Sequence, residues 1–363
     1  MVRVGLIGFG LAGQAFHAPV IRGVPGMELA CVVERRGTRA QEKYPEVWVA
    51  RNLAELLEDD EIQLCVIATP NDSHFELARA CLQAGRDVVV DKPFAPTLAE
   101  AEELVRLASE LGRLITVYQD RRWDGDFFTV RNILQSGALG KVVEYECRYD
   151  RFRVEPKANA WRERADQPGA GVLFDLGPHV LDQALALFGE PKAITAAAFC
   201  QRETSQVDDA FDVCLIYSNS EHSGERGGLR AMLRARIVAY APGPHFLIHG
   251  TKGSFVKYGM DPQEARLRGG NIPQGFDWGA DWGAEGDELW GTLSLVGEPG
   301  RKIATERGDY RGFYANVRDA IEKKAPLEVT PEQALRTMRA VVLAHKSSRE
   351  RRTVEWTEAV EEG

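Results

Sequence analysis

A glycine pattern near the start of the chain is of a type that can hold a phosphate group. Gly8, Gly10 and Gly13 follow an apolar run at residues 2–7 and precede a segment with a helical pattern. In a strand–turn–helix context, the first glycine permits a tight turn, the second lets a pyrophosphate approach the backbone, and the third lets the helix pack closely on the strand. Free N–H groups at the start of the helix attract the anion. The pattern therefore predicts a dinucleotide site, and the alternative is a glycine-rich turn that holds no ligand.

Charged residues that follow the glycines bear on which dinucleotide binds. Glu34 stands 21 positions after Gly13, at the end of an apolar run at residues 29–33. An acidic residue at about this offset binds the ribose hydroxyls of NAD. Arg35 and Arg36 come next, and arginines can pair with the 2′-phosphate of NADP in a bidentate manner. These two signals conflict, so we expect both cofactors to bind.

Two other polar groups stand where apolar, strand-like runs end. Thr69-Pro70-Asn71 follows the run at residues 64–68, and Lys92 follows the run at residues 87–90. In a parallel sheet, ligands lie beyond the carboxyl ends of the strands. We therefore expect residues 69–71 beside the nicotinamide end of the dinucleotide, and Lys92 at the same crevice. A lysine in a loop is usually only solvated, so the argument for Lys92 depends on this position.

A carboxylate and an imidazole stand four residues apart in the second half of the chain. Asp175 and His179 flank Pro178, ahead of an apolar helical pattern that runs to Phe188. Since proline is tolerated in the first turn of a helix, we expect the helix to begin near residues 175–177 and the two side chains to lie close together. An imidazole titrates near neutral pH, which suits proton transfer. The alternative is an N-cap aspartate beside an incidental surface histidine.

Alternating strand and helix patterns are expected to position these residues. Over residues 1–120 the alternation predicts an α/β fold, a doubly wound parallel sheet with helices on both faces. Capping boxes at Ser73–Glu76 and Thr97–Glu100 are expected to open two of its helices.

Residues 121–363 are expected to form a second domain of the α+β type. Strand patterns separated by Gly and Pro turns between residues 142 and 258 predict an open, mainly antiparallel sheet. Residues 261–300 are rich in Gly, Trp and Asp and show no clear period, so we expect long loops there. Residues 310–323 and 331–350 show the pattern of amphipathic helices.

Composition excludes several classes of partner. The 363 residues carry a formal charge of −9, which argues against nucleic acid and anionic membranes as partners. No apolar run approaches the ~20 residues of a membrane span, and the chain starts in a strand without a cationic leader. The six cysteines include no C-x-x-C motif, which suits buried thiols in a reducing compartment, so we expect a cytoplasmic protein. The seven histidines show no metal-ligand spacing, so we expect no metal.

Together these motifs resemble the Gfo/Idh/MocA family, which is named after glucose–fructose oxidoreductase and inositol dehydrogenase. The resemblance covers nearly the whole chain and rests on Gly8-Phe9-Gly10, Ala68-Thr69-Pro70-Asn71, Asp91-Lys92-Pro93, Asp175-x-Gly177-x-His179-x-x-Asp182 and Thr330-Pro331-Glu332. Residues 10–14 and 121–124 look most like the branch of NADP-dependent scyllo-inositol dehydrogenases, which favours NADP slightly over NAD. Asp91 stands where glutamate is commoner and Ala170 interrupts a usual run of glycines, but neither change touches a catalytic side chain.

The resemblance implies an NAD(P)-dependent oxidoreductase that transfers a hydride between the nicotinamide and a secondary alcohol or ketone of a sugar, an inositol or a related polyol. His179 would act as general acid or base, and Asp175 would orient its ring. Lys92 would stabilise developing alkoxide character on the substrate oxygen. We expect these three catalytic side chains to meet at one substrate.

The resemblance also implies two sets of binding residues. The residues expected to bind the cofactor are Gly8, Phe9, Gly10, Leu11, Gly13, Glu34, Arg35, Arg36, Thr69, Pro70, Asn71, His74, Asp91, Lys92 and Pro93. The residues expected to bind the substrate are Lys92, Tyr118, Arg122, Trp161, Arg162, Asp175 and His179. For Tyr118 and Trp161 the alternative is core packing.

The architecture of the family implies an assembly. One face of the second domain's sheet is expected to form the interface of a homodimer or homotetramer, and the last helices are expected to return to the first domain. Three rival functions are a non-catalytic nucleotide-binding regulator, a redox-neutral glycosidase that uses enzyme-held NAD⁺, and a metal-dependent dehydrogenase. Intact Lys92, Asp175 and His179 argue against the regulator, because a sensor needs no proton transfer.

Overall fold

The computed structural model describes residues 1–156, 163–166, 169–217, 228–270, 272–273 and 275–360. The chain forms two compact units. The first unit comprises residues 1–124, 262–283 and 308–335, and the second comprises residues 125–261, 284–307 and 336–363. Among the described residues, no helix is both long and apolar enough to cross a bilayer.

The first unit is built on a six-stranded parallel sheet, as predicted. Its strands lie in the order β3-β2-β1-β4-β5-β6, the doubly wound order of a Rossmann fold. The strands are β1 (Val2–Ile7), β2 (Met27–Val33), β3 (Trp48–Ala50), β4 (Leu64–Ile67), β5 (Asp87–Val90) and β6 (Ile115–Val117). All four residues of β4 are buried, because helices cover both faces of the sheet.

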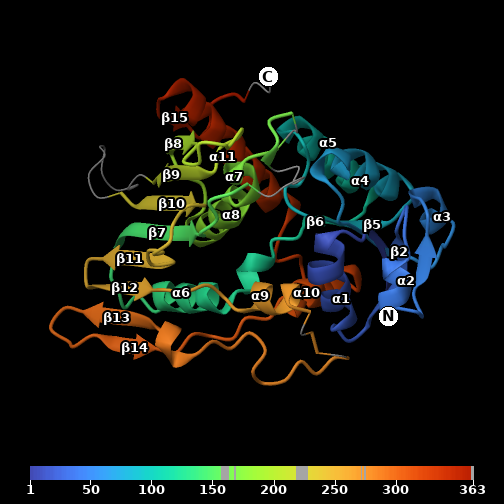
Figure 1. Ribbon diagram of the computed structural model, residues 1–363, viewed down its shortest axis with the longest axis horizontal. Helices are drawn as coiled ribbons and strands as arrows, with labels where there is room; N and C mark the ends of the chain where they lie inside the picture. The colour runs from blue at the N-terminus through green and yellow to red at the C-terminus, as the bar shows by residue number, and fades with distance from the viewer. Residues whose placement is uncertain (157–162, 167–168, 218–227, 271, 274, 361–363) are drawn as a thin grey trace. The chain divides into compact units, whose positions relative to one another are not determined.

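Figure 1 shows α4 and α5 on one side of this sheet and α1 and α10 on the other. The helical segments of the unit are η1 (Gly13–His17), α1 (Ala18–Arg22), α2 (Arg39–Lys43), α3 (Leu53–Leu57), η2 (Asn71–Ser73), α4 (His74–Gln83), α5 (Leu98–Leu111), η3 (Asp120–Trp123), α9 (Gln263–Arg268) and α10 (Arg311–Ile321). The long helix α11 (Pro331–Glu350) begins in the first unit and continues in the second.

The helix starts show how local sequence sets these elements. Thr97 accepts a hydrogen bond from the backbone N–H of Glu100, whose side chain returns to the Thr97 backbone, so this capping box is confirmed. The box predicted at Ser73 is wrong, because the Ser73 hydroxyl bonds Thr69 and Pro70 instead and α4 is preceded by the 3₁₀ turn η2. The helix after the glycines contains a π turn, η1, in which Ala18 N–H donates to the Gly13 carbonyl.

The second unit is built on a nine-stranded mixed sheet that is mainly antiparallel, as predicted. Its order is β14-β13-β12-β11-β7-β10-β9-β8-β15, and among these neighbours only β7 and β10 run parallel. The strands are β7 (Val142–Asp150), β8 (Ala193–Phe199), β9 (Ala210–Ile216), β10 (Arg230–Arg236), β11 (Phe246–Gly250), β12 (Gly253–Lys257), β13 (Gly291–Leu295), β14 (Arg301–Ile303) and β15 (Val354–Glu355).

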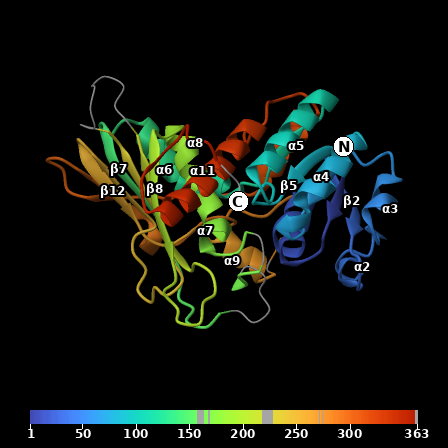
Figure 2. The same ribbon diagram turned by 90° about the horizontal axis from the view of Figure 1, so that it is seen from above.

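One face of this sheet packs against helices and forms the core of the unit (Figure 2). The covering helices are α6 (Gly125–Gln135), α8 (Gly177–Phe188) and the second-unit part of α11. Along β10, Ala231, Leu233 and Ala235 point into this core, while the residues between them are half-buried on the opposite face. That opposite face carries ion pairs, such as those of Arg234 with Glu146 and Asp212.

One further prediction about local structure is wrong. Residues 261–300 are not only loops, since they contain α9, the 3₁₀ turn η5 (Asp287–Leu289) and strand β13. The contacts that hold this segment are long-range. The buried Gln263 side chain, for example, donates a hydrogen bond to the Trp123 carbonyl and accepts one from the Tyr310 backbone N–H. The helix that was predicted to begin near residues 175–177 does so, because α8 begins at Gly177; a separate short helix, α7 (Val172–Asp175), precedes it.

Candidate active site

The register of the first sheet brings the ends of five strands to one edge. Ile7 pairs with Val33 on one side and with Ile67 on the other. Ile67 pairs in turn with Val90, and Val90 with Val117. The residues that follow these strands therefore share the carboxyl edge, where a doubly wound sheet binds its ligand.

The glycine turn at this edge has the geometry of a phosphate cradle. Gly8 has a φ of +102°, and a Cβ at this position would lie 2.7 Å from the Ala68 carbonyl oxygen. A Cβ on Gly13 would lie 2.2 Å from the Gly8 carbonyl oxygen, so helix and strand approach as closely as the motif predicts. A Cβ on Gly10 would meet nothing within 4 Å, so the backbone there is open to a pyrophosphate. The residues present therefore fit NAD(P).

Two neighbours of the cradle differ in exposure. Phe9 is buried and its ring packs edge-on against Tyr44, with 6.2 Å between the ring centroids. Leu11 is exposed at the start of the helix. Phe9 thus anchors the turn, while Leu11 lies on the surface.

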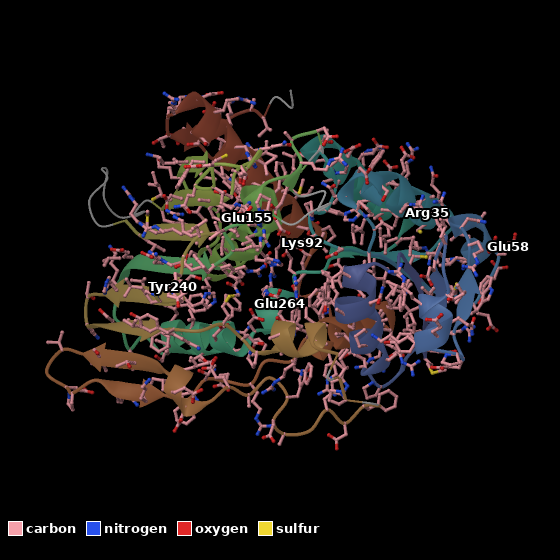
Figure 3. The ribbon with its side chains drawn as sticks, viewed as in Figure 1. Arg35, Glu58, Lys92, Glu155, Tyr240 and Glu264 are labelled. Carbon is pink, nitrogen blue, oxygen red and sulfur yellow. The ribbon has the colours of Figure 1, made fainter. Side chains whose placement is uncertain are left out.

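The carboxylate after β2 is already bonded within the protein. Glu34 is buried, and its two oxygens accept hydrogen bonds from Arg39 Nε at 3.0 Å and from the Ala40 backbone N–H at 2.9 Å. Arg35 and Arg36 are exposed, and Arg35 is labelled in Figure 3. Arg39 therefore offsets the charge of Glu34, a contact that the sequence analysis did not anticipate.

His74 joins two of the strand ends. Its Nδ1 lies 2.8 Å from the Pro93 carbonyl oxygen and its Nε2 lies 3.0 Å from the Thr69 carbonyl oxygen. Burial lowers the pKa of the imidazole below its usual range, although Asp91 acts in the opposite direction. His74 thereby positions Thr69-Pro70-Asn71 relative to the loop that carries Lys92.

Lys92, labelled in Figure 3, follows β5 and is half-buried. The Asp91 carboxylate accepts a hydrogen bond from the Lys92 backbone N–H at 2.8 Å, and His17 Nε2 lies 3.9 Å from the same oxygen. His17 is buried and its Nδ1 lies 2.6 Å from the Tyr314 hydroxyl. Burial raises the pKa of Asp91, but the nearby His17 and Lys92 outweigh this effect, so the pKa of Asp91 lies below its usual value.

Two residues that were expected to bind the substrate, Tyr118 and Arg122, make contacts within the first unit. Tyr118 is buried, with its ring centroid 4.4 Å from that of His17, and its hydroxyl donates to the Phe16 carbonyl at 3.0 Å. Arg122 is also buried and donates to Gln333 Oε1 at 2.7 Å. Both side chains thus contribute to packing. The other two, Trp161 and Arg162, lie outside the described residues.

Asp175 and His179 lie one turn apart in consecutive helices of the second unit. Asp175 ends α7, and His179 lies in the first turn of α8, where Pro178 needs no N–H partner. His179 is buried, and its ring lies parallel to that of Tyr149 on β7, with an interplanar angle of 11°. The alternative of an incidental surface histidine is therefore wrong, because His179 is buried.

The start of α7 is fixed by a distant carboxylate. Asp208 Oδ2 accepts a hydrogen bond from the Leu173 backbone N–H at 2.7 Å. A Cβ on Gly171 would lie 2.1 Å from Asp208 Oδ1, so a glycine with its φ of +97° is required there. Asp208 therefore holds the helix on which Asp175 lies, a contact that no local pattern predicts.

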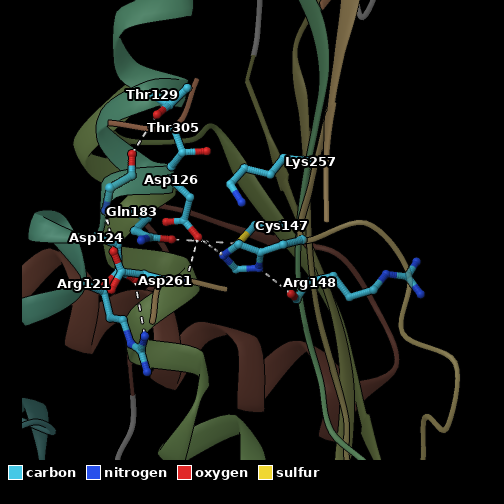
Figure 4. Close-up of polar contacts among 12 residues, drawn as sticks. Arg121, Asp124, Asp126, Thr129, Cys147, Arg148, Gln183, Lys257, Asp261 and Thr305 are labelled. Carbon is cyan, nitrogen blue, oxygen red and sulfur yellow. Dashed lines mark hydrogen bonds and ion pairs between the residues drawn. The ribbon is translucent and has the colours of Figure 1, made fainter. Parts of the chain in front are cut away.

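His245 and Asp126 form a buried imidazole–carboxylate pair in the same unit, and Asp126 is labelled in Figure 4. His245 packs against the Tyr149 ring at 5.1 Å, and its Nδ1 lies 2.7 Å from the Arg148 carbonyl oxygen. Its Nε2 lies 3.5 Å from Asp126 Oδ2, which also accepts from the Asp261 backbone N–H at 3.2 Å. These contacts fix the strand residue on which His179 stacks.

The strand end after β6 holds two residues that sequence reasoning missed, Gln119 and Asp120. Both are buried. Gln119 Oε1 has no hydrogen-bond partner among the described residues, and a buried acceptor of this kind is usually satisfied by a ligand or water. Their place directly after a strand was the available signal.

No group of three or more His, Cys, Asp or Glu side chains suited to a metal occurs in the described part of the chain.

The fold and the cradle define a dinucleotide-binding protein of two α/β units, and comparison with known proteins gives its family. The family described as "Oxidoreductase family, NAD-binding Rossmann fold" matches residues 2–119, and the one described as "Oxidoreductase family, C-terminal alpha/beta domain" matches residues 131–356. The chain therefore belongs to the Gfo/Idh/MocA oxidoreductase family and carries an NAD(P)-binding Rossmann domain.

Similar proteins cover nearly the whole chain. The uncharacterized oxidoreductase YdgJ of Escherichia coli is 41% identical over 97% of this chain and 98% of its own length. The scyllo-inositol 2-dehydrogenase (NADP(+)) IolW of Bacillus subtilis is 36% identical over 97% and 95%. The solved structure of yvaA from Bacillus subtilis has a TM-score of 0.89 at 36% identity, with 98% of each chain covered.

The glycine cradle makes a prediction that separates folding from binding. Gly10→Ala should leave the urea midpoint unchanged, because its Cβ meets nothing within 4 Å, but should weaken NAD(P)H binding about 10-fold or more by crowding the pyrophosphate. Gly13→Ala should lower the midpoint, because its Cβ would lie 2.2 Å from the Gly8 carbonyl oxygen. Fluorescence titration with NADH and NADPH and urea unfolding measure both. Equal effects of the two substitutions on affinity and stability would contradict this assignment.

Proposed function

We propose that this protein is an NAD(P)-dependent oxidoreductase that transfers a hydride between the nicotinamide and a secondary alcohol or ketone carbon of a sugar, an inositol or a related polyol. The observation that carries the proposal is His179, a buried imidazole one turn after the carboxylate of Asp175. The name of IolW, a relative at 36% identity, supports the substrate class.

Each of three side chains has a role in this proposal. His179 takes the hydroxyl proton when the alcohol is oxidised and returns it when the ketone is reduced. Asp175 orients the imidazole and stabilises its charged form. Lys92 donates a hydrogen bond to the substrate oxygen and stabilises its developing negative charge. The bound nicotinamide supplies the hydride chemistry, and the proposal requires Lys92 and His179 to reach the same substrate molecule.

A substrate screen tests the reaction class directly. Inositols, other polyols and aldoses would be offered with NAD⁺ and NADP⁺, and the corresponding ketones with NADH and NADPH, with absorbance read at the reduced nicotinamide band. Steady-state formation of NAD(P)H supports a dehydrogenase and excludes a redox-neutral glycosidase. Cofactor binding without turnover on any alcohol or ketone would favour a regulator instead.

Loss of the imidazole should affect turnover and spare cofactor binding. His179→Ala is expected to lower kcat by about 10²–10⁴-fold, the usual contribution of a general acid or base, with little change in the NAD(P)H dissociation constant. Lys92→Met should act similarly on kcat, and Asp175→Asn should be milder because it only misorients the ring. Steady-state kinetics and fluorescence titration give the two quantities.

A second histidine of the same unit serves as the matched control. His249 lies on β11, where its Nδ1 lies 2.7 Å from Ser254 Oγ, and it has no role in the proposal. His249→Ala should therefore keep normal turnover. Normal turnover in His179→Ala would overturn the assignment of the general acid or base.

Cofactor preference is proposed to favour NADP slightly. The two exposed arginines after β2 can bind a 2′-phosphate, and Arg39 offsets the charge of Glu34. Replacing both Arg35 and Arg36 by Ala should raise the dissociation constant of NADPH about 10-fold or more and change that of NADH little.

Arg79→Ala provides the control for that measurement, since Arg79 is a part-exposed arginine of the same unit that pairs with Glu76 on α4. It should leave both dissociation constants unchanged. A preference of the unmodified protein for NADH above about 100-fold (2.7 kcal/mol) would contradict the role given to the arginines.

A homodimer or homotetramer is also proposed. Among the described residues, the helices of the second unit cover one face of its nine-stranded sheet, and the other face carries half-buried side chains such as Met232 and Leu247. A second copy would cover that face. Light scattering at micromolar concentration should give at least twice the mass of one chain, and a monomeric mass would refute the assembly.

A further inference from the structure

A fully buried histidine of the first unit, His17, lies close to the loop that carries Lys92 and has no part in the proposed reaction. It is the last residue of the π turn η1, and π turns inside helices are frequently found at functional sites. Its Nε2 lies 3.9 Å from Asp91 Oδ1. The same oxygen accepts a hydrogen bond from the Lys92 backbone N–H at 2.8 Å. One carboxylate oxygen thus links this imidazole to the backbone of the proposed catalytic lysine.

Contacts on several sides hold the His17 ring. Its Nδ1 lies 2.6 Å from the Tyr314 hydroxyl. The Tyr118 ring packs against the imidazole with 4.4 Å between the ring centroids, and the Tyr118 hydroxyl donates to the carbonyl of the preceding residue, Phe16, at 3.0 Å. The rings of Tyr118 and Tyr314 also pack on each other, with 5.5 Å between their centroids. These contacts keep Nε2 of the imidazole facing the Asp91 carboxylate.

The position of the ring proton follows from these contacts. A neutral imidazole has one N–H and one lone pair, and the bond made by one nitrogen decides which of the two is protonated. Burial raises the pKa of the Tyr314 hydroxyl well above its usual range, so this group keeps its proton. Among the described residues, the acceptor for that proton is His17 Nδ1. The proton of the ring therefore lies on Nε2.

A protonated Nε2 stabilises the carboxylate that it faces. At 3.9 Å the N–H and the Asp91 oxygen are too far apart for a hydrogen bond, but they attract each other electrostatically. A lone pair at Nε2 would instead repel the carboxylate. Because an ionised carboxylate is a stronger acceptor than a neutral group, Asp91 holds the backbone N–H of Lys92 and so anchors the loop from which the lysine side chain extends.

We propose that His17 is a positioning residue that acts through Asp91: its Nε2–H, fixed by the Tyr314 hydroxyl, orients the Asp91 carboxylate, which in turn holds the backbone of Lys92. The series of contacts runs from α10 through η1 to the end of β5, all within the first unit. His17 is fully buried and makes no bond to the substrate. The catalytic role of Lys92 belongs to the proposed function, on which the kinetic part of this inference rests.

The position of the ring proton can be measured without turnover. NMR of the whole protein labelled with ¹⁵N-histidine distinguishes protonated from unprotonated ring nitrogens, and the His17 signals are those that are lost in His17→Leu. In the unmodified sequence Nε2 should carry a proton. In Tyr314→Phe the Nδ1 signal should move, because its donor is lost. A proton on Nδ1 together with an unprotonated Nε2 would overturn the inference.

Tyr310→Phe is the matched control for the loss of the hydroxyl. Tyr310 is a buried tyrosine of the same unit, and its hydroxyl donates to Asp124 Oδ1 at 2.7 Å instead of to His17. The substitution should therefore leave the ¹⁵N signals of His17 unchanged. Equal shifts in Tyr310→Phe and Tyr314→Phe would overturn the role given to the Tyr314 hydroxyl.

Hydrogen exchange of the Lys92 backbone amide tests the hold on the loop. His17→Leu keeps a side chain of similar size but removes the N–H, so exchange at this amide should become about 10-fold faster or more. His17→Gln keeps an N–H donor and should restore part of the protection. The amide of Val66, inside β4, serves as the internal reference. No acceleration at Lys92, or equal acceleration at both amides, would overturn the inference.

A double-mutant comparison separates this inference from the proposed function. Where an alcohol or ketone is turned over, Tyr314→Phe should lower kcat about 10-fold with little change in KM, because a misplaced catalytic group slows the chemical step, and Tyr310→Phe should keep normal turnover. In the Lys92→Met background Tyr314→Phe should have no further effect, since residues that act as a unit are not additive. An equal loss in both backgrounds would overturn the positioning role and leave the reaction class intact. If no substrate is turned over, the ring proton and the Lys92 amide still decide.

Discussion

The in-register pairing of five parallel strands is the constraint on which the candidate site depends. Val33, Ile7, Ile67, Val90 and Val117 form one continuous row of neighbours across the first sheet. Parallel strands joined by helices all end at the same edge, so the residue after each strand is delivered to that edge whatever its distance along the chain. The glycine cradle, the buried Glu34, the hydrogen bonds of His74 and the loop that carries Lys92 all lie at this edge for that reason.

Sequence was sufficient wherever a local pattern has one physical meaning. The run at residues 2–7 followed by Gly8 and Gly13 predicts a buried strand that meets a close-packed helix, and the structure shows the close approaches at both glycines. The predicted capping box is present at Thr97. At Ser73 it is absent, because this residue ends a 3₁₀ turn and its hydroxyl donates to the Pro70 carbonyl instead. A motif of the right letters thus fails when the chain before it does not take the extended conformation that capping needs.

The rest could not be predicted, because it is set by contacts between segments far apart in the chain. No pattern near Gly171 predicts that the Asp208 carboxylate lies where a side chain at this position would be, or that it accepts a hydrogen bond from the first turn of α7. The stacking of His179 on Tyr149 follows from how α8 packs on the sheet, not from either local sequence. The raised pKa of Asp120 is of the same kind, because burial is its largest cause and burial is a property of the folded unit.

The Glu34 carboxylate bears on both cofactors, because it can accept hydrogen bonds from ribose hydroxyls and its charge repels a 2′-phosphate. A carboxylate oxygen has two lone pairs, so each oxygen of Glu34 can accept one more hydrogen bond beyond those from Arg39 and Ala40. Ribose hydroxyls can therefore still bind it, while the charge that would repel a 2′-phosphate is offset by Arg39. The arginines beside it are exposed, so their attraction for that phosphate is screened by salt. Ionic strength should consequently weaken NADPH binding more than NADH binding, because the buried carboxylate is shielded from salt and the exposed guanidinium groups are not.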